Sequence, residues 1–275
     1  MQILGIGQSQ NRTVRGLERT NRALSKILNR LSTAQRINRA SDDAAGLAVS
    51  EQLRTQIRGF KMATRNVADA MSALNIGEGA SNEISDLLQR NRELAIQASS
   101  DTLTDEQREA IDVEFQQNLE EIDRLADTAQ FNGQNVLNGT GLGSGNAVIQ
   151  AGANEGETIT LPEINLGVDP LGLTGVNVQT GTDAASAIGD IDTALGTLNS
   201  TRATMGATVN RLESAVRNLS VAEVNSQSAE EILRDQDMAS GITDLTRERL
   251  LQETGMYAFG RYNEISANHI MSLLQ

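Results

Sequence analysis

Cysteine is absent from this chain of 275 residues, and aromatic residues are scarce, with no Trp, two Tyr and four Phe. The lack of thiols excludes disulfides, thiolate metal sites and cysteine nucleophiles. With so few rings, the core must be built from aliphatic side chains, as in helical bundles. A binding pocket lined by aromatic residues is therefore not expected.

Two further absences limit the function. The chain has 23 basic and 36 acidic residues, a net charge of −13, and no basic run dense enough to follow a phosphate backbone, so nucleic acid is a poor partner. No apolar run reaches the roughly 18 residues that would predict a membrane span. The lone histidine, His269, is expected to be structural, and no combination of nucleophile, base and orienting group is present. The sequence therefore predicts no enzyme, no cofactor and no metal site.

What the chain does have is apolar heptads that reach both ends of the sequence. Near the start, the stripe steps by three and four residues with Asn21 as its one polar position, and near the end a second stripe continues almost to Gln275. Helices that are apolar on more than one side need several neighbours, and one chain supplies only two such helices. We therefore expect an assembly interface with other copies, formed by Val14, Leu17, Leu24, Leu28, Leu31, Leu251, Ala258, Ile265, Leu273 and Leu274.

Long helices are also predicted between the ends. Apolar residues recur in sevens from about Ala44 to Ala98, after Ser41 as N-cap, which is a helix of roughly 80 Å. A third helix begins after Thr104, where Gln107 stands in the capping-box position. The most regular heptads span residues 188–219 and predict a long helix that runs back along the two N-terminal helices. The predicted fold is mainly α: a long antiparallel helical bundle or coiled-coil rod with paired N- and C-terminal helices.

Composition changes between residues 131 and 182. Both prolines lie here, and β-favouring runs on either side of Gly152–Glu157 predict a small β-hairpin near residues 147–161. The glycines at 139, 141, 143 and 145 lack the preceding strand and the Lys-Ser/Thr ending of a phosphate-binding loop. We expect them to form a plain flexible loop.

Five passages resemble bacterial flagellin, and they follow one another over nearly the whole chain. The first includes Ser41-Asp-Asp-Ala-Ala-Gly and the fourth includes Gln130-Phe-Asn-Gly. The five passages are residues 36–48, 88–98, 120–124, 130–137 and 149–159. Each is moderate evidence alone, and their order and spacing make the resemblance strong.

The resemblance implies a structural subunit that polymerises into the bacterial flagellar filament. Residues 1–40 with 234–275 would form the inner terminal-helix domain, and residues 41–233 the helical rod with its β-hairpin, without an extra outer domain. A hook-filament junction protein shares this terminal-helix plan but is less well matched by the Asp42-Asp43-Ala-Ala-Gly and Gln130-Phe-Asn-Gly passages. A cytoplasmic signalling hairpin, as in chemoreceptors, is disfavoured by the Gly- and Pro-rich β segment.

The resemblance also implies partners and a location. Besides copies of itself, the chain would meet a flagellar export chaperone, the export apparatus, and the hook-associated junction and cap proteins. The opening residues have no basic region and too short an apolar run for a cleaved signal peptide, so the protein is expected either to stay in the cytoplasm or to be exported by a dedicated machine. The resemblance implies the second, with an extracellular filament as the destination. A Toll-like innate immune receptor would contact Arg90, Leu94 and Glu114, the positions that match the family's receptor patch.

Overall fold

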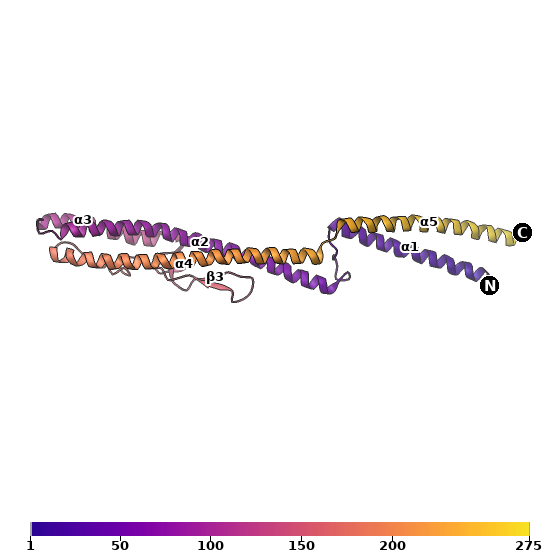
Figure 1. Cartoon of the computed structure of the whole chain (residues 1–275), viewed down its shortest axis with the longest axis horizontal. Helices are drawn as coiled ribbons and strands as arrows, with labels where there is room; N and C mark the ends of the chain where they lie inside the picture. Colours follow the sequence, from indigo (N-terminus) through magenta and orange to yellow (C-terminus); the bar gives the residue numbers. More distant parts are fainter. Residues whose placement is uncertain (1, 275) are drawn as a thin grey trace. The chain divides into compact units, whose positions relative to one another are not determined.

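The computed structural model describes the backbone of residues 2–274 and the side chains of residues 11–265, 267 and 271. Long helices dominate it, and the predicted mainly α fold is confirmed (Figure 1). None of the helices within residues 2–274 has a stretch that is long and apolar enough to cross a membrane. The helices are α1 (Gln2–Thr33), α2 (Ala44–Ala98), α3 (Asp105–Thr128), α4 (Gly181–Arg234) and α5 (Met238–Leu274).

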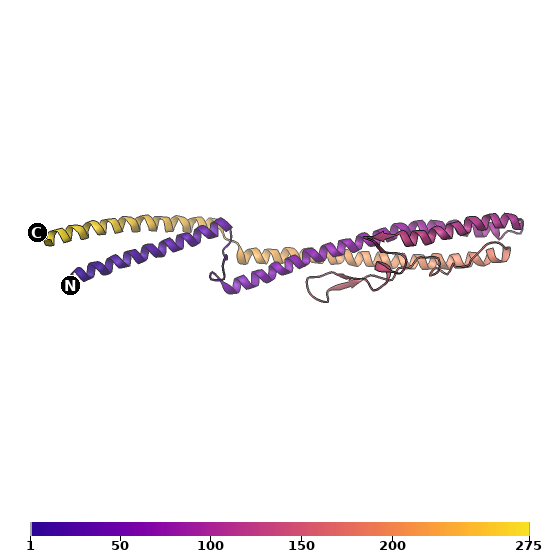
Figure 2. The same ribbon diagram turned by 180° about the vertical axis from the view of Figure 1, so that it is seen from behind.

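The chain divides into two compact units. The terminal unit contains residues 1–55 and 225–275, and the bundle unit contains residues 56–224. In the terminal unit, α1 and α5 lie side by side and run antiparallel, as the sequence predicts (Figure 1). In the bundle unit, α3 folds back along α2, and α4 runs beside both (Figure 2).

The bundle unit holds nearly all of the hydrophobic core. Phe115 of α3 is fully buried, and many of the other core side chains are alanines, including Ala63, Ala70, Ala95 and Ala187. Small side chains let helix backbones approach closely, and larger aliphatic residues fill the space between them. The low aromatic content is thus consistent with a thin, tightly packed bundle.

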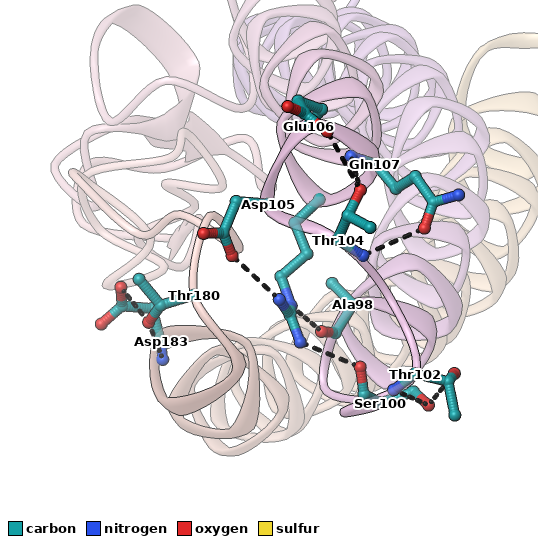
Figure 3. Close-up of polar contacts among 10 residues, drawn as sticks. Ala98, Ser100, Thr102, Thr104, Asp105, Glu106, Gln107, Thr180 and Asp183 are labelled. Carbon is teal, nitrogen blue, oxygen red and sulfur yellow. Dashed lines mark hydrogen bonds and ion pairs between the residues drawn. The ribbon is translucent and has the colours of Figure 1, made fainter.

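Two helix starts show how local sequence sets the element boundaries. The capping box predicted for α3 is confirmed: the Thr104 side chain accepts from the Gln107 backbone N–H, and the Gln107 side chain accepts from the Thr104 N–H (Figure 3). The expectation for α2 was wrong by two residues. Asp43, not Ser41, caps this helix, because its Oδ1 accepts from the Gly46 N–H at 2.9 Å.

The β structure consists of two small antiparallel hairpins in the bundle unit. The expected one is formed by β3 (Val148–Gln150) and β4 (Thr158–Thr160), with Ile149 opposite Ile159. The other, formed by β1 (Gln130–Phe131) and β2 (Gln134–Asn135), was not predicted. Its signal was the Asn132-Gly133 pair, which is typical of a two-residue hairpin turn.

The glycine run is not the flexible loop that we expected. Gly141–Gly143 forms a 3-10 turn, η1, and Gly143 is buried. The Gly143 carbonyl accepts from the Ile164 N–H at 2.9 Å, and a Cβ at this position would lie only 2.4 Å from the Val136 carbonyl oxygen. Glycine is needed here because two other backbone segments pass so close to it.

Candidate interaction surfaces

The seam between α1 and α5 combines leucines with glycines. The Leu31 side chain lies 2.9 Å from where a Cβ of Gly241 would be, and Leu17 lies 3.1 Å from the corresponding point at Gly255. Both leucines and both glycines are two heptads apart, so the contacts repeat in register along an antiparallel pair. Glycine at these positions lets the leucine side chains approach the α5 backbone.

One polar pair lies within this seam. The Gln252 amide donates from Nε2 to Oδ1 of Asn21 at 2.7 Å. Asn21 is the polar position that interrupts the α1 stripe, so its partner comes from the other helix. A polar pair at one seam position fixes the register, because any shift of the helices would leave both amides without this bond.

The structure divides the predicted assembly residues between the seam and the outer surface. Leu17, Leu24 and Leu31 are half-buried, which fits the seam. The exposed residues are Val14, Leu28, Leu251, Ala258 and Ile265. The side chains of Leu273, Leu274 and His269 lie outside the described residues. Further exposed apolar residues on α5 are Ile242, Leu250, Met256, Tyr257 and Met271.

This exposure leaves the terminal unit with little core of its own. Among the described side chains, Ile37 is the only apolar one in this unit that is fully buried, whereas Ile265 stays 56% exposed and Tyr257 72% exposed. Helices in proteins gain most of their stability from packing an apolar face, and helices without such packing are only marginally stable. Exposed apolar side chains gathered on one pair of helices indicate an interaction site.

The linkers of the terminal unit are held together by backbone and arginine contacts. The Arg36 N–H donates to the Arg234 carbonyl at 2.7 Å, its guanidinium donates to the Leu233 carbonyl at 2.7 Å, and the Gln236 N–H donates to Ala34. Gln35 and Asp235 form an isolated antiparallel bridge. The chain segment after α1 is thereby joined to the segment before α5.

The Ser41-Asp42-Asp43 passage organises the same linker. Asp42 forms an ion pair with Lys26 at 2.7 Å, and its other oxygen accepts from the backbone N–H groups of Asn38 and Arg39. The hydrogen bond from Lys26 holds the pKa of Asp42 below its usual value of 3.8. This carboxylate therefore stabilises the linker above that pH, and the contribution is lost as the pH falls through the lowered pKa.

A second ionic tie connects the ends of α2 and α4 that belong to the terminal unit. Arg234 donates to Glu51 at 3.0 Å, and Arg54 donates to the same oxygen. The hydrogen bond from Arg234 lowers the pKa of Glu51 from its usual 4.5. As for Asp42, the ionised Glu51 stabilises the terminal unit fully above its usual pKa. This contribution is lost as the pH falls through the lowered pKa.

The predicted receptor residues are partly brought together. The Arg90 guanidinium donates from Nε and Nη2 to one oxygen of Glu114, at 2.9 and 2.7 Å, and from Nη1 to Glu93. The Glu114 carboxylate raises the pKa of Arg90. Arg90 and Glu114 are each about half exposed, with relative side-chain exposures of 50% and 46%. Leu94, by contrast, is only 2% exposed and belongs to the core.

Two buried charged residues were missed by the sequence analysis. Arg108 donates from Nε to the Ala98 carbonyl and from Nη2 to the Ser100 carbonyl, both at 3.0 Å. Asp112 accepts from the Val178 N–H and from the Gln179 side chain, both at 2.9 Å. On a charged helix these residues look like any solvated side chain, so no sequence signal distinguishes them.

None of the described residues forms a group of three or more His, Asp or Glu side chains that could hold a metal ion. The geometry instead combines a helical bundle with a pair of terminal helices whose apolar surface is uncovered. A fold of this kind defines a class of helical structural subunits whose uncovered apolar surface is available to other proteins.

The comparisons with known proteins place the chain within this class. Two family models match: the bacterial flagellin N-terminal helical region over residues 7–141, and the bacterial flagellin C-terminal helical region over residues 188–274. The chain belongs to the bacterial flagellin family. It is a structural subunit of the flagellar filament, which serves motility.

Individual relatives agree with the family assignment. A flagellar filament 31.3 kDa core protein of Treponema maltophilum is 40% identical over 269 residues, covering 93% of this chain and 94% of that protein. A flagellin of Halalkalibacterium halodurans is 41% identical over 241 residues, covering 87% and 88%. The crystal structure of Bacillus cereus flagellin is 35% identical, with a TM-score of 0.51, over 56% of this chain and 88% of that one.

Proposed function

We propose that filament assembly is driven by burial of the outer apolar surface of α1 and α5 between copies of the chain. The observation that carries this proposal is the contrast between an almost coreless terminal unit and its exposed Leu251, Tyr257 and Ile265. Burial of apolar surface contributes about 25 cal/mol per Å² and offsets the entropy cost of ordering the helices. Contacts that repeat without closing on themselves produce a helical tube.

In this arrangement, residues 1–40 with 234–275 form the inner domain of the filament, and residues 41–233 form its outer wall. The subunit reaches the extracellular filament through the flagellar export apparatus with a chaperone, without a cleaved signal peptide, and meets the junction and cap proteins at the ends of the filament. A terminal pair with so little core is easily unfolded for passage through a narrow channel.

The proposal is tested by electron microscopy of purified protein through a pH cycle. We expect filaments to dissociate in acid, as the pH falls through the lowered pKa values of Asp42 and Glu51, because these carboxylates then lose the charges that hold the terminal unit together. Return to neutral pH with short filament seeds should restore long uniform tubes. Protein that stays monomeric at neutral pH with seeds would contradict self-sufficient assembly.

We further propose that the patch around Arg90 and Glu114 binds a Toll-like innate immune receptor. The support is a half-exposed ion pair whose arginine offers a planar set of donors suited to a polar interface. Leu94 would contribute by packing beneath the patch, since its side chain is buried.

Arg90→Ala is expected to weaken receptor binding by monomeric protein about tenfold or more, a loss typical of removing an arginine from a polar interface. Binding would be measured with the soluble receptor ectodomain on immobilised monomer. Arg124→Ala is the matched control, because Arg124 is equally exposed and paired with Glu121 on α3. Equal binding by Arg90→Ala and the unaltered chain would contradict the proposed patch.

A further inference from the structure

The chain contains two Asn-Gly pairs, and the structure treats them very differently. They are Asn132-Gly133 and Asn138-Gly139, only six positions apart. In an Asn-Gly pair, the glycine backbone nitrogen can attack the asparagine side-chain carbonyl, because glycine has no side chain to obstruct the approach. Whether the attack occurs in a folded protein depends on what holds the two groups.

At the first pair, little holds them. Asn132 and Gly133 are exposed, and no other heavy atom outside the immediate chain lies within 4 Å of where a Gly133 Cβ would be. Neither the Gly133 N–H nor the Asn132 side chain makes a hydrogen bond to any part of the chain that the structure describes. Both residues have positive φ, 50° and 75°, as the turn of a tight hairpin requires.

The hairpin around this turn is also short. β1 and β2 pair over two positions only, Gln130 with Asn135 and Phe131 with Gln134. A ladder of this length opens locally at low free-energy cost. Brief opening frees the Asn132-Gly133 bond from the turn conformation, so the nitrogen can reach the side-chain carbonyl.

At the second pair, every participating group is engaged. The Gly139 N–H donates to the Ile164 carbonyl at 3.0 Å, so the attacking nitrogen is occupied. The Asn138 side chain donates to Asp127 at 3.2 Å and accepts from both the backbone and the hydroxyl of Thr140. Asn138 also forms a backbone bridge with Asn165. The two pairs therefore form a matched comparison within one chain.

We propose that Asn132 is a site of spontaneous, structure-selected deamidation in the native subunit. The Gly133 nitrogen loses its proton to hydroxide and bonds to Cγ of Asn132. The Cγ–NH2 bond then breaks as the leaving nitrogen takes a proton from water, which releases ammonia and regenerates the hydroxide. Water then opens the cyclic imide at either carbonyl, giving aspartate or isoaspartate. No oxidation or reduction takes place, and water is the only co-reactant.

The product changes the surface of the bundle unit. A carboxylate replaces the amide of Asn132, which lines the same pocket as Asp69, so this pocket gains a second carboxylate. Isoaspartate also lengthens the backbone of the two-residue turn by one atom. This turn connects Phe131 and Gln134, which are paired across the hairpin. Each deamidated subunit therefore carries one more negative charge in this pocket than an unmodified one.

The test uses hydroxylamine, which cleaves the chain at the cyclic imide. The full-length subunit is aged at mildly alkaline pH, treated with hydroxylamine either folded or unfolded in guanidinium, and its fragments are identified by mass spectrometry. We expect the folded protein to be cut between residues 132 and 133 at least tenfold faster than between 138 and 139. The unfolded protein should be cut at both bonds at similar rates.

Two variants assign the cleavage. Asn132→Gln should abolish the cut in the folded protein, because a longer side chain forms its cyclic imide far more slowly. Asn138→Gln should leave that cut unchanged. Equal cutting at both bonds in the folded protein, faster cutting at Asn138, or no cutting at either bond would each overturn the proposal.

Discussion

Removal of residues 234–275 is expected to abolish filament formation while the bundle unit stays folded. The deletion removes α5, and with it Gly241, Gly255 and Gln252, which α1 contacts through Leu31, Leu17 and Asn21. It also removes the exposed apolar side chains of α5, including Leu251 and Tyr257. Polymerisation with seeds would be followed by electron microscopy and sedimentation, and helicity by circular dichroism.

A matched pair of point variants separates assembly from folding. Leu251→Asp and Val113→Asp each place a charge on a helix surface at a similarly exposed position, 50% and 54% exposed. Both should leave the folded content of the subunit unchanged, because neither side chain belongs to the core. Only Leu251→Asp should block polymerisation. Filaments from the truncated chain, or equal loss of assembly in both point variants, would refute the role of the α5 surface.

Arg108→Met should destabilise the bundle unit by about 3 kcal/mol, the upper range for hydrogen bonds to a charged group whose acceptors are left unpaired. Its guanidinium satisfies the carbonyl of Ala98, the last residue of α2, and that of Ser100 in the following turn. Figure 3 shows Ala98, Ser100 and Asp105 gathered around this unlabelled guanidinium. Without it, the turn between α2 and α3 loses the contacts that reverse the chain.

The effect would be measured as the urea concentration at half-unfolding, followed by circular dichroism at constant salt. The control is Arg124→Met, which removes an exposed i,i+3 ion pair with Glu121 and should leave the urea midpoint nearly unchanged. Arg108→Lys should be intermediate, since one ammonium group cannot reproduce the forked contacts. Equal midpoints for Arg108→Met and the unaltered chain would show that the turn forms without the arginine.

Most helix positions follow from the sequence because their causes are local. The α2 helix has the predicted bounds, and the Thr104 capping box is present as expected, since both depend on residues within a few positions of one another. Asp43 rather than Ser41 caps α2 because Gly46 brings the backbone close to the Asp43 side chain and to Ile37. Local sequence patterns identify several candidate N-cap residues. Tertiary contacts then determine which of the adjacent candidates caps the helix.

Buried polar residues depend on distant parts of the chain, so their roles could not be predicted. Asn91 occupies a heptad position and is fully buried, with its side-chain oxygen accepting from Asn118 at 2.8 Å and its amide donating to the Phe115 carbonyl. These partners lie on α3, far along the sequence. Leu94 shows the same limit of sequence reasoning. Its place in the predicted receptor patch implies an exposed side chain, but packing within the bundle buries it.

The sequence by itself determined that this protein is a cysteine-free, mainly helical flagellin with apolar stripes on its terminal helices. Periodicity and composition act along the chain, so these properties need no knowledge of packing. Only the tertiary structure decided that Leu17 and Leu31 face Gly255 and Gly241 while Leu251 and Ile265 stay uncovered. It also decided that the Gly139 N–H is hydrogen-bonded to Ile164, whereas the Gly133 N–H has no hydrogen bond within the described residues. A heptad has the same sequence pattern whether it packs against its own chain or against another copy. An Asn-Gly pair likewise has the same sequence whether or not its groups are hydrogen-bonded. Only the residues that folding brings next to each of them decide which case applies.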